Sequence, residues 1–176
     1  MPDPTAVTRS DLSPGSRLPD AELVDHAGNS RRLSELVGGD ATILHFYRGW
    51  WCPKEQAFFR RLIRLQGEAE VAYSRIVSVS VDPWPIAAAF RAGLGARWTF
   101  LSDEDRSVQR ELGLRETTDT VNDPYVPTVF TVDPELTIHS SYNGYWFWGR
   151  PTEHELVADL RAISRAIRPD WEAPTP

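Results

Sequence analysis

The sequence has very little cysteine: its 176 residues include a single one, Cys52. One cysteine cannot form a disulfide within the chain, so a fold held by internal disulfides is excluded. One cysteine and four histidines without close pairing also lack the residue sets that build tetrahedral metal sites. We therefore expect no metal and no cofactor, and a reducing cytoplasm is the expected compartment.

Long apolar runs and a positive charge balance are also missing. No apolar stretch approaches the roughly 20 residues of a transmembrane helix, and the N-terminal residues lack the charged-then-apolar pattern of a signal peptide. The formal net charge is −6, whereas nucleic-acid-binding domains are basic. The expected partners therefore include neither a membrane nor a nucleic acid.

The alternation of helical and strand patterns predicts one α/β domain. We expect it over residues 12–168, between a flexible leader at 1–11 and a tail at 169–176. Strands and helices alternate before a hairpin and a last helix, which is typical of a central mixed sheet with helices on both faces. The strand patterns cover residues 21–25, 41–47, 75–81, 97–101, 126–132 and 135–142.

Two capping signals and two unusual segments complete this pattern. Thr152 with Glu155 forms a capping box before the last helix, and Ser102 with Asp105 is a similar helix start. Residues 117–125 are polar and are the expected mobile insertion, in a place where loops often carry specificity. Residues 142–148 are rich in aromatics, and a core plug, a subunit interface and a substrate-facing wall all stay open for them.

Cys52 lies where a strand pattern changes into a helix pattern. Residues 41–47 form a nearly continuous apolar run, as in a strand covered on both faces. Pro53 suits the first helical position, where its missing N–H costs nothing. Cys52 is therefore expected at a helix N-terminus, where N–H groups and the helix dipole favour an anion and where thiols can titrate well below their usual pKa of about 8.5.

The neighbours of Cys52 act in opposite directions on its reactivity. Arg48 and Lys54 are cations that favour a thiolate. Trp50 and Trp51 favour the neutral thiol if they bury the sulfur, because desolvation disfavours the charged form. A packed, inert cysteine stays the alternative to a reactive one, since free cysteines are commonly buried.

The sequence Trp51-Cys52-Pro53, followed by Glu55, resembles the active-site turn of the peroxiredoxins. This is the AhpC/TSA family, named for alkyl hydroperoxide reductase and thiol-specific antioxidant, and its members have a thioredoxin-like fold. The resemblance extends over about residues 12–168. Further segments that resemble the family follow in the family's order, at residues 77–82, 100–103, 126–133 and 149–151.

The resemblance implies a thiol-dependent peroxidase of the 1-Cys type. Cys52 would attack a hydroperoxide, and an external thiol or a thioredoxin-like reductant would restore it. Arg48 is the expected catalytic guanidinium, and Glu55 either orients an arginine or favours the first helical turn. A homodimer is also implied. The expected substrate-binding residues are Trp51, Pro53, Trp84, Pro127 and Arg150.

Departures from the family pattern keep two other functions open. Gly49 stands where the family usually has a Thr or Ser three residues before the cysteine, and Val126 or Pro127 stands where it has an arginine. Both differences favour a redox-inactive binding protein that kept the fold. Trp51-Cys52-Pro53, together with a Pro127 that resembles the cis-proline of thioredoxins, favours a thiol transferase.

Two further residue assignments stay open at this point. Arg150 and Arg115 are alternatives to Arg48 as the guanidinium that stabilises the leaving oxygen. His45 lies on the predicted strand that leads to the cysteine, either as a base near Cys52 or as a satisfied histidine of the core.

Overall fold

The computed structural model describes residues 12–144 and 149–171. In this part of the chain, seven strands form one sheet: β1 Glu22–Asp25, β2 Ser30–Arg32, β3 Ala41–Phe46, β4 Ser74–Ser80, β5 Thr99–Ser102, β6 Thr128–Val132 and β7 Ile138–Asn143. The helices of the same part are α1 Leu33–Val37, α2 Pro53–Val71, α3 Trp84–Leu94, α4 Ser107–Leu112 and α5 Glu153–Ile167.

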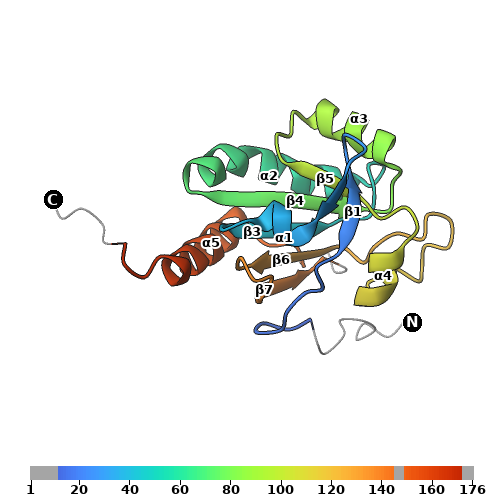
Figure 1. The fold of residues 1–176 in the computed structure, drawn as a ribbon. Coiled ribbons are helices and arrows are strands. Elements are labelled where there is room, and N and C mark those ends of the chain that lie inside the picture. The colour runs from blue at the N-terminus through green and yellow to red at the C-terminus, as the bar shows by residue number, and fades with distance from the viewer. Residues whose placement is uncertain (1–11, 145–148, 172–176) are drawn as a thin grey trace.

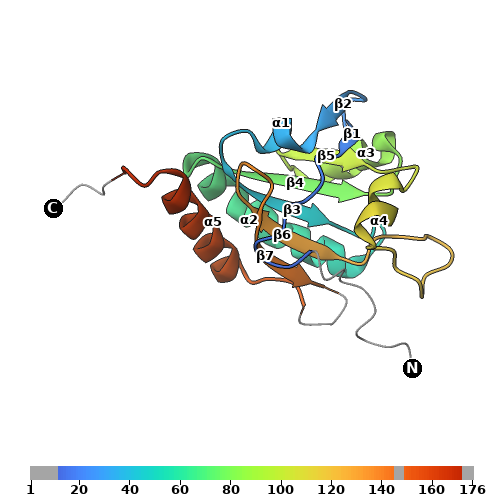
Figure 2. The same ribbon diagram turned by 60° about the horizontal axis from the view of Figure 1, so that its bottom comes forward.

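The sheet is mixed and has helices on both faces. Its strand order is β2-β1-β5-β4-β3-β6-β7. β3, β4 and β5 run parallel, and the other neighbours pair antiparallel. Helices α2, α3 and α5 cover one face, and α1 and α4 cover the other, as Figure 1 and Figure 2 show. The predicted fold class is therefore confirmed.

The central strand β3 is buried along its whole length. Ile43 packs into the cluster under α2 and α5, whereas Leu44 and Phe46 pack into the cluster under α1 and α4. Successive side chains of a strand point to opposite faces, so both faces of β3 need apolar residues. This explains the continuous apolar run at residues 41–47 and confirms the predicted strand.

Of the two helix starts predicted from capping residues, the structure confirms that of α5 and contradicts the one at Ser102. Thr152 and Glu155 form the capping box of α5 as predicted. The predicted start at Ser102 is wrong, because Ser102 pairs with Ser80 and ends β5. The carboxylate of Asp103 caps α4 instead and accepts the backbone N–H groups of residues 108 and 109.

The remaining predicted segments are only partly described. The loop at residues 117–125 is tied to the domain by an ion pair between Arg48 and Asp119, with 3.0 Å between Nη2 and Oδ2, and its mobility stays a prediction. Of the aromatic segment, Tyr142 is partly buried, and its hydroxyl donates to Asp159. Residues 145–148, the expected leader at 1–11 and the last residues of the tail lie outside the described residues.

Candidate active site

Cys52 occupies the position that the sequence predicts, at the start of α2. It is the N-cap residue, its backbone is extended, and Pro53 is the first helical residue. The carbonyl of Cys52 accepts the N–H of Gln56 at 3.0 Å, and its own N–H donates to the carbonyl of Gly49 at 3.2 Å. Only 2% of the residue is exposed, so the sulfur sits at a helix N-terminus and is also shielded from bulk water.

The loop before Cys52 requires glycine at position 49. Gly49 has φ +151°, and a Cβ there would lie 2.5 Å from Nε1 of Trp51. A Thr or Ser at this place would be strained and would collide with the indole ring. The hydroxyl that peroxiredoxins usually carry three residues before the cysteine is therefore excluded by the packing of Trp51.

Glu55 is fully buried in the first turn of α2 and is the centre of a polar cluster. It accepts from Nη2 of Arg150 at 2.6 Å, from Nε2 of His45 at 3.2 Å and from the backbone N–H of Arg48 at 3.5 Å. Burial by itself raises the pKa of Glu55, but the hydrogen bonds from His45 and Arg150 and the charge of Arg150 outweigh it and lower that pKa. Glu55 is therefore a carboxylate that orients Arg150.

Arg48 and Arg150 both lie near this carboxylate, but their guanidinium groups have different partners. The guanidinium of Arg48 pairs with Asp119 and lies over the ring of Trp51, 5.0 Å from its centroid, so it is directed away from Glu55. Arg150 has a 12% exposed side chain and also donates to the carbonyl of Gly144. Each of the two arginines keeps a buried Nε–H without an acceptor among the described residues.

Glu55 connects Arg150 to the start of α2. Cys52 is the N-cap residue and Glu55 the third residue of this helix, so both belong to the same helix start. Because Glu55 holds Arg150, a cation from the loop before α5 joins the cysteine turn. Arg150 is thus held at the first turn of α2 by Glu55, while Arg48 lies over the ring of Trp51, the residue before Cys52.

Two other candidate residues lie elsewhere in the structure. Trp84 is 40% exposed, and its ring lies 3.4 Å from the position of a Cβ on Gly28, in the turn between β1 and β2. Arg115 pairs with Asp123 at 2.5 Å between Nε and Oδ1, with a 60% exposed side chain, so it is a surface charge.

Pro127 lies on the Arg150 side of the site. Its carbonyl accepts the N–H of Gly144, whose carbonyl in turn accepts from Arg150. The cis-proline prediction is wrong, because the described residues contain no cis peptide bond. The trans form is the default for peptide bonds, and a likeness in sequence position does not by itself select the other one.

Asp82 is a site residue that the sequence reasoning did not single out. Its Oδ2 accepts the backbone N–H of Trp50 at 3.1 Å and the hydroxyl of Ser80 at 3.3 Å. Burial raises the pKa of Asp82. The residue follows β4, and β4 runs parallel to β3, so their carboxyl ends meet at one edge of the sheet. The parallel pairing of these two strands could therefore have predicted the contact of Asp82 with the loop before Cys52.

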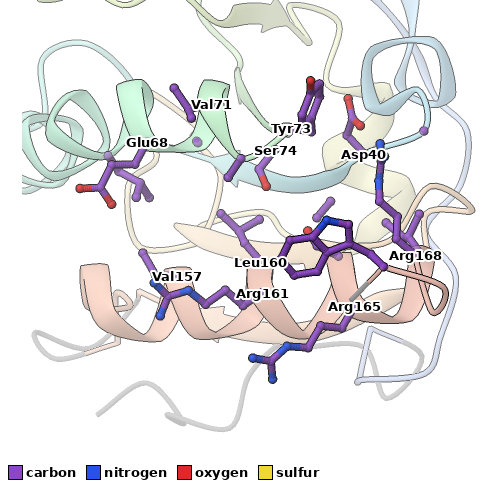
Figure 3. A pocket seen from close by; sticks show the side chains of 18 residues that line it. Asp40, Glu68, Val71, Tyr73, Ser74, Val157, Leu160, Arg161, Arg165 and Arg168 are labelled. Carbon is purple, nitrogen blue, oxygen red and sulfur yellow. The ribbon is translucent and has the colours of Figure 1, made fainter. Parts of the chain in front are cut away.

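A separate hollow of about 660 Å³ lies at the other end of the sheet. Figure 3 shows it between the end of α2 and helix α5, with Ser74, Leu160 and Arg168 among its lining residues. Ser74 begins β4, whereas Cys52 follows the far end of β3. None of the predicted site residues lines this hollow, so it is not part of the cysteine site.

Three comparisons place these findings among known proteins. The model of the AhpC/TSA family matches residues 14–141. Two proteins of Mycobacterium tuberculosis strains that are named as peroxiredoxins are 32% identical over 155 residues, which cover 86% of this chain and 98% of theirs.

In the range 12–144 and 149–171, no helix has the length and apolar character needed to cross a membrane.

Solved structures show the same fold. The crystal structure of peroxidoxin BcpB from Mycobacterium tuberculosis matches with a TM-score of 0.70 at 24% identity, covering 89% of this chain and 99% of that one. The crystal structure of reduced Prx3 from Vibrio vulnificus in complex with hydrogen peroxide matches with a TM-score of 0.75 at 22% identity, covering 84% of this chain and 96% of that one. These likenesses establish the thioredoxin-like fold.

Proposed function

This chain belongs to the AhpC/TSA family of peroxiredoxins, and on that premise we propose that it reduces hydroperoxides with Cys52 as its single attacking thiol. A thiol peroxidase of the peroxiredoxin type is the activity that goes with the family. The proposal adds the 1-Cys mechanism and the residue roles. It rests chiefly on one observation: Cys52 is the N-cap residue of α2, and Glu55, in the first turn of that helix, holds the guanidinium of Arg150.

The proposed reaction begins with the thiolate of Cys52. The sulfur attacks the terminal oxygen of ROOH, an S–O bond forms, and the O–O bond breaks. Sulfur is oxidised by two electrons to a sulfenic acid, the peroxide is reduced, and the alkoxide RO⁻ takes a proton to leave as ROH. For hydrogen peroxide, the leaving group is hydroxide and the product is water.

Charge develops on the leaving oxygen during this step, and donors that face it lower the barrier. Gly49 offers no hydroxyl for this purpose. We assign the task to Arg150, which Glu55 holds at the first turn of α2, and to the helix N-terminus. Arg48, whose guanidinium pairs with Asp119 and lies over the ring of Trp51, is the second candidate donor. Substrate contacts of Trp51, Pro53, Pro127 and Trp84 stay predictions.

Recovery of the thiol needs a second molecule, because the chain has one cysteine. An external thiol R′SH attacks the sulfenic acid, and a mixed disulfide and water form. A second R′SH then attacks the mixed disulfide, which releases R′SSR′ and restores Cys52. A low-molecular-weight thiol or a thioredoxin-like protein fits this role. The homodimer and the cytoplasmic location also stay predictions.

Trapping of the oxidised sulfur tests the proposal. The protein is treated with one equivalent of hydrogen peroxide in the presence of dimedone and analysed by mass spectrometry, with Cys52→Ser as the control. We expect the sulfenic-acid adduct on Cys52 in the wild type and none in the control. An unreacted thiol in the folded protein would support the redox-inactive alternative. Fast mixed-disulfide exchange with glutathione disulfide, without a peroxide reaction, would support the transferase.

A further inference from the structure

A chain of buried hydrogen bonds extends from Glu55 into the core. Nε1 of Trp98 donates to Oγ of Ser78 at 2.9 Å, and that Oγ lies 3.5 Å from Nδ1 of His45. Nε2 of His45 lies 3.2 Å from Oε2 of Glu55, whose other oxygen accepts from Arg150 at 2.6 Å. His45 is 1% exposed and Ser78 and Glu55 are fully buried, so this line of contacts excludes bulk water.

The geometry fixes one tautomer of His45. A carboxylate only accepts hydrogen bonds, so the nitrogen that faces Glu55 carries the proton. Ser78 accepts the Trp98 N–H, and with Nε2 of His45 protonated its own hydroxyl can donate to Nδ1. Burial above all lowers the pKa of His45, and the charge of Arg150 acts in the same direction against the opposing effect of Glu55, which agrees with a neutral ring.

Aromatic side chains hold the imidazole in this orientation. The rings of Phe58 and Phe59 contact it edge-on with centroid distances of 4.9 Å each, and Tyr47 lies at 5.5 Å. The ring is thus fixed by its packing as well as by its two polar contacts. A mobile glutamate at position 55 would let Arg150 turn away from Cys52.

We propose that His45 is a positioning residue for the peroxide reaction: through Glu55 it fixes the guanidinium of Arg150 beside Cys52. The inference rests on the proposed function. It gives His45 no proton transfer to the substrate, because the imidazole faces the carboxylate and the core serine. Ser78 and Trp98 set its tautomer from the other side.

Variants of His45 separate positioning from packing. His45→Phe keeps an aromatic ring and removes both polar contacts, whereas the amide of His45→Gln can still donate to Glu55 and accept from Ser78. We expect the rate constant of Cys52 with hydrogen peroxide to fall about tenfold in His45→Phe and by less than about threefold in His45→Gln. In a Glu55→Gln background, His45→Phe should have no further effect, because residues of one network are not additive.

Serine variants in one strand provide a matched pair that disturbs the packing less. Ser78→Ala removes the contact with His45 and is expected to slow the reaction about threefold. Ser74→Ala, four residues earlier in β4, removes a buried hydroxyl that has no partner among the described residues and should leave the rate unchanged. This pair decides the matter if His45→Phe does not fold. Equal rates in Ser78→Ala and Ser74→Ala, or in His45→Phe and wild type, would overturn the inference.

The tautomer can be read without any peroxide. Long-range ¹H–¹⁵N correlations on the wild-type protein should show His45 protonated on Nε2 and not on Nδ1. Protonation on Nδ1 would overturn the inference even if the peroxide reaction is fast. A wild-type thiol that does not react with peroxide would instead remove the proposed function, and the role of His45 in that reaction with it.

Discussion

Two buried carboxylates lie at helix starts in this domain and differ in what they accept. Asp103, 1% exposed, receives backbone N–H groups of α4 and the hydroxyl of Tyr125 at 2.6 Å. Glu55, in the first turn of α2, receives a guanidinium and an imidazole instead. The donors of Asp103 are neutral, whereas one donor of Glu55 is the guanidinium of Arg150, which we propose acts on Cys52. Burial alone therefore does not distinguish the two acids, and the charge of their donors does.

The largest effect on the reaction is expected for Glu55→Gln. The amide loses the charge-assisted contact with Arg150, and hydrogen bonds to charged groups contribute about 1.5–3 kcal/mol. The rate constant of Cys52 with hydrogen peroxide should therefore fall between about ten- and a hundredfold in stopped-flow experiments. Glu35→Gln, which changes an exposed carboxylate of α1, serves as the control. A wild-type rate in Glu55→Gln would remove the distinction between the two buried acids.

Asp103→Asn should show the opposite profile. The change replaces an acceptor of two backbone N–H groups by an amide, and we expect the free energy of unfolding to fall by about 2 kcal/mol. Urea titration measures this loss. The peroxide rate of the folded variant should stay within about twofold of the wild type, and a strongly reduced rate would show that α4 also acts on the cysteine site.

Low pH should affect Glu55 and Asp103 differently, because His45 is a neighbour of Glu55 alone. Burial, above all, lowers the pKa of His45 from its usual 6.5, so between the folded-state pKa and pH 6.5 only the unfolded chain binds this proton. Stability should fall as the pH decreases through that window, by up to about 1.4 kcal/mol per pH unit.

The pH dependence of the free energy of unfolding is compared between wild type and His45→Gln. The pKa of His26 is also lowered, but His26 is present in both proteins, so the difference between them isolates the contribution of His45. Unfolding is followed by urea titration at several pH values. If both proteins lose stability with the same slope, His45 is not the buried neutral imidazole described above.

The smallest effect is expected at a third helix start, where the cap is exposed. Thr152 accepts the N–H of Glu155 and completes the capping box of α5. Thr152→Ala should lower the free energy of unfolding by about 1 kcal/mol without changing the peroxide rate. His154→Ala, at an exposed position of the same turn, should change neither. A slower reaction in Thr152→Ala would mean that the start of α5 positions Arg150.

Local signals were sufficient to predict where Cys52 lies. The apolar run at residues 41–47 and Pro53 act over a few residues, and the strand and the helix start follow from them. The contact between Arg150 and Glu55 was not predictable, because Arg150 stands 95 residues after Glu55 and only the packing of the loop before α5 brings them together. The capping role of Asp103 was missed for a similar reason. Ser102 pairs with Ser80 in the sheet, a contact between distant parts of the sequence, so the next residue, Asp103, receives the N–H groups of α4.

The requirement for Gly49 also depends on the tertiary structure. The sequence shows a missing hydroxyl, which favoured an inactive protein. The structure shows that the ring of Trp51 occupies the space of a side chain at that position. The loop is thus built without the hydroxyl, and the proposed reaction assigns its task to other donors around the helix start.

The most direct test of this account is the second-order rate constant of the Cys52 thiol with hydrogen peroxide, compared with a free cysteine at the same pH. The arrangement of α2, Glu55 and Arg150 predicts a reaction at least roughly a hundredfold faster than that of the free amino acid, equivalent to about 2.7 kcal/mol of transition-state stabilisation. A rate equal to or below that of free cysteine, in protein that is folded and fully reduced, would show that the helix start does not activate Cys52.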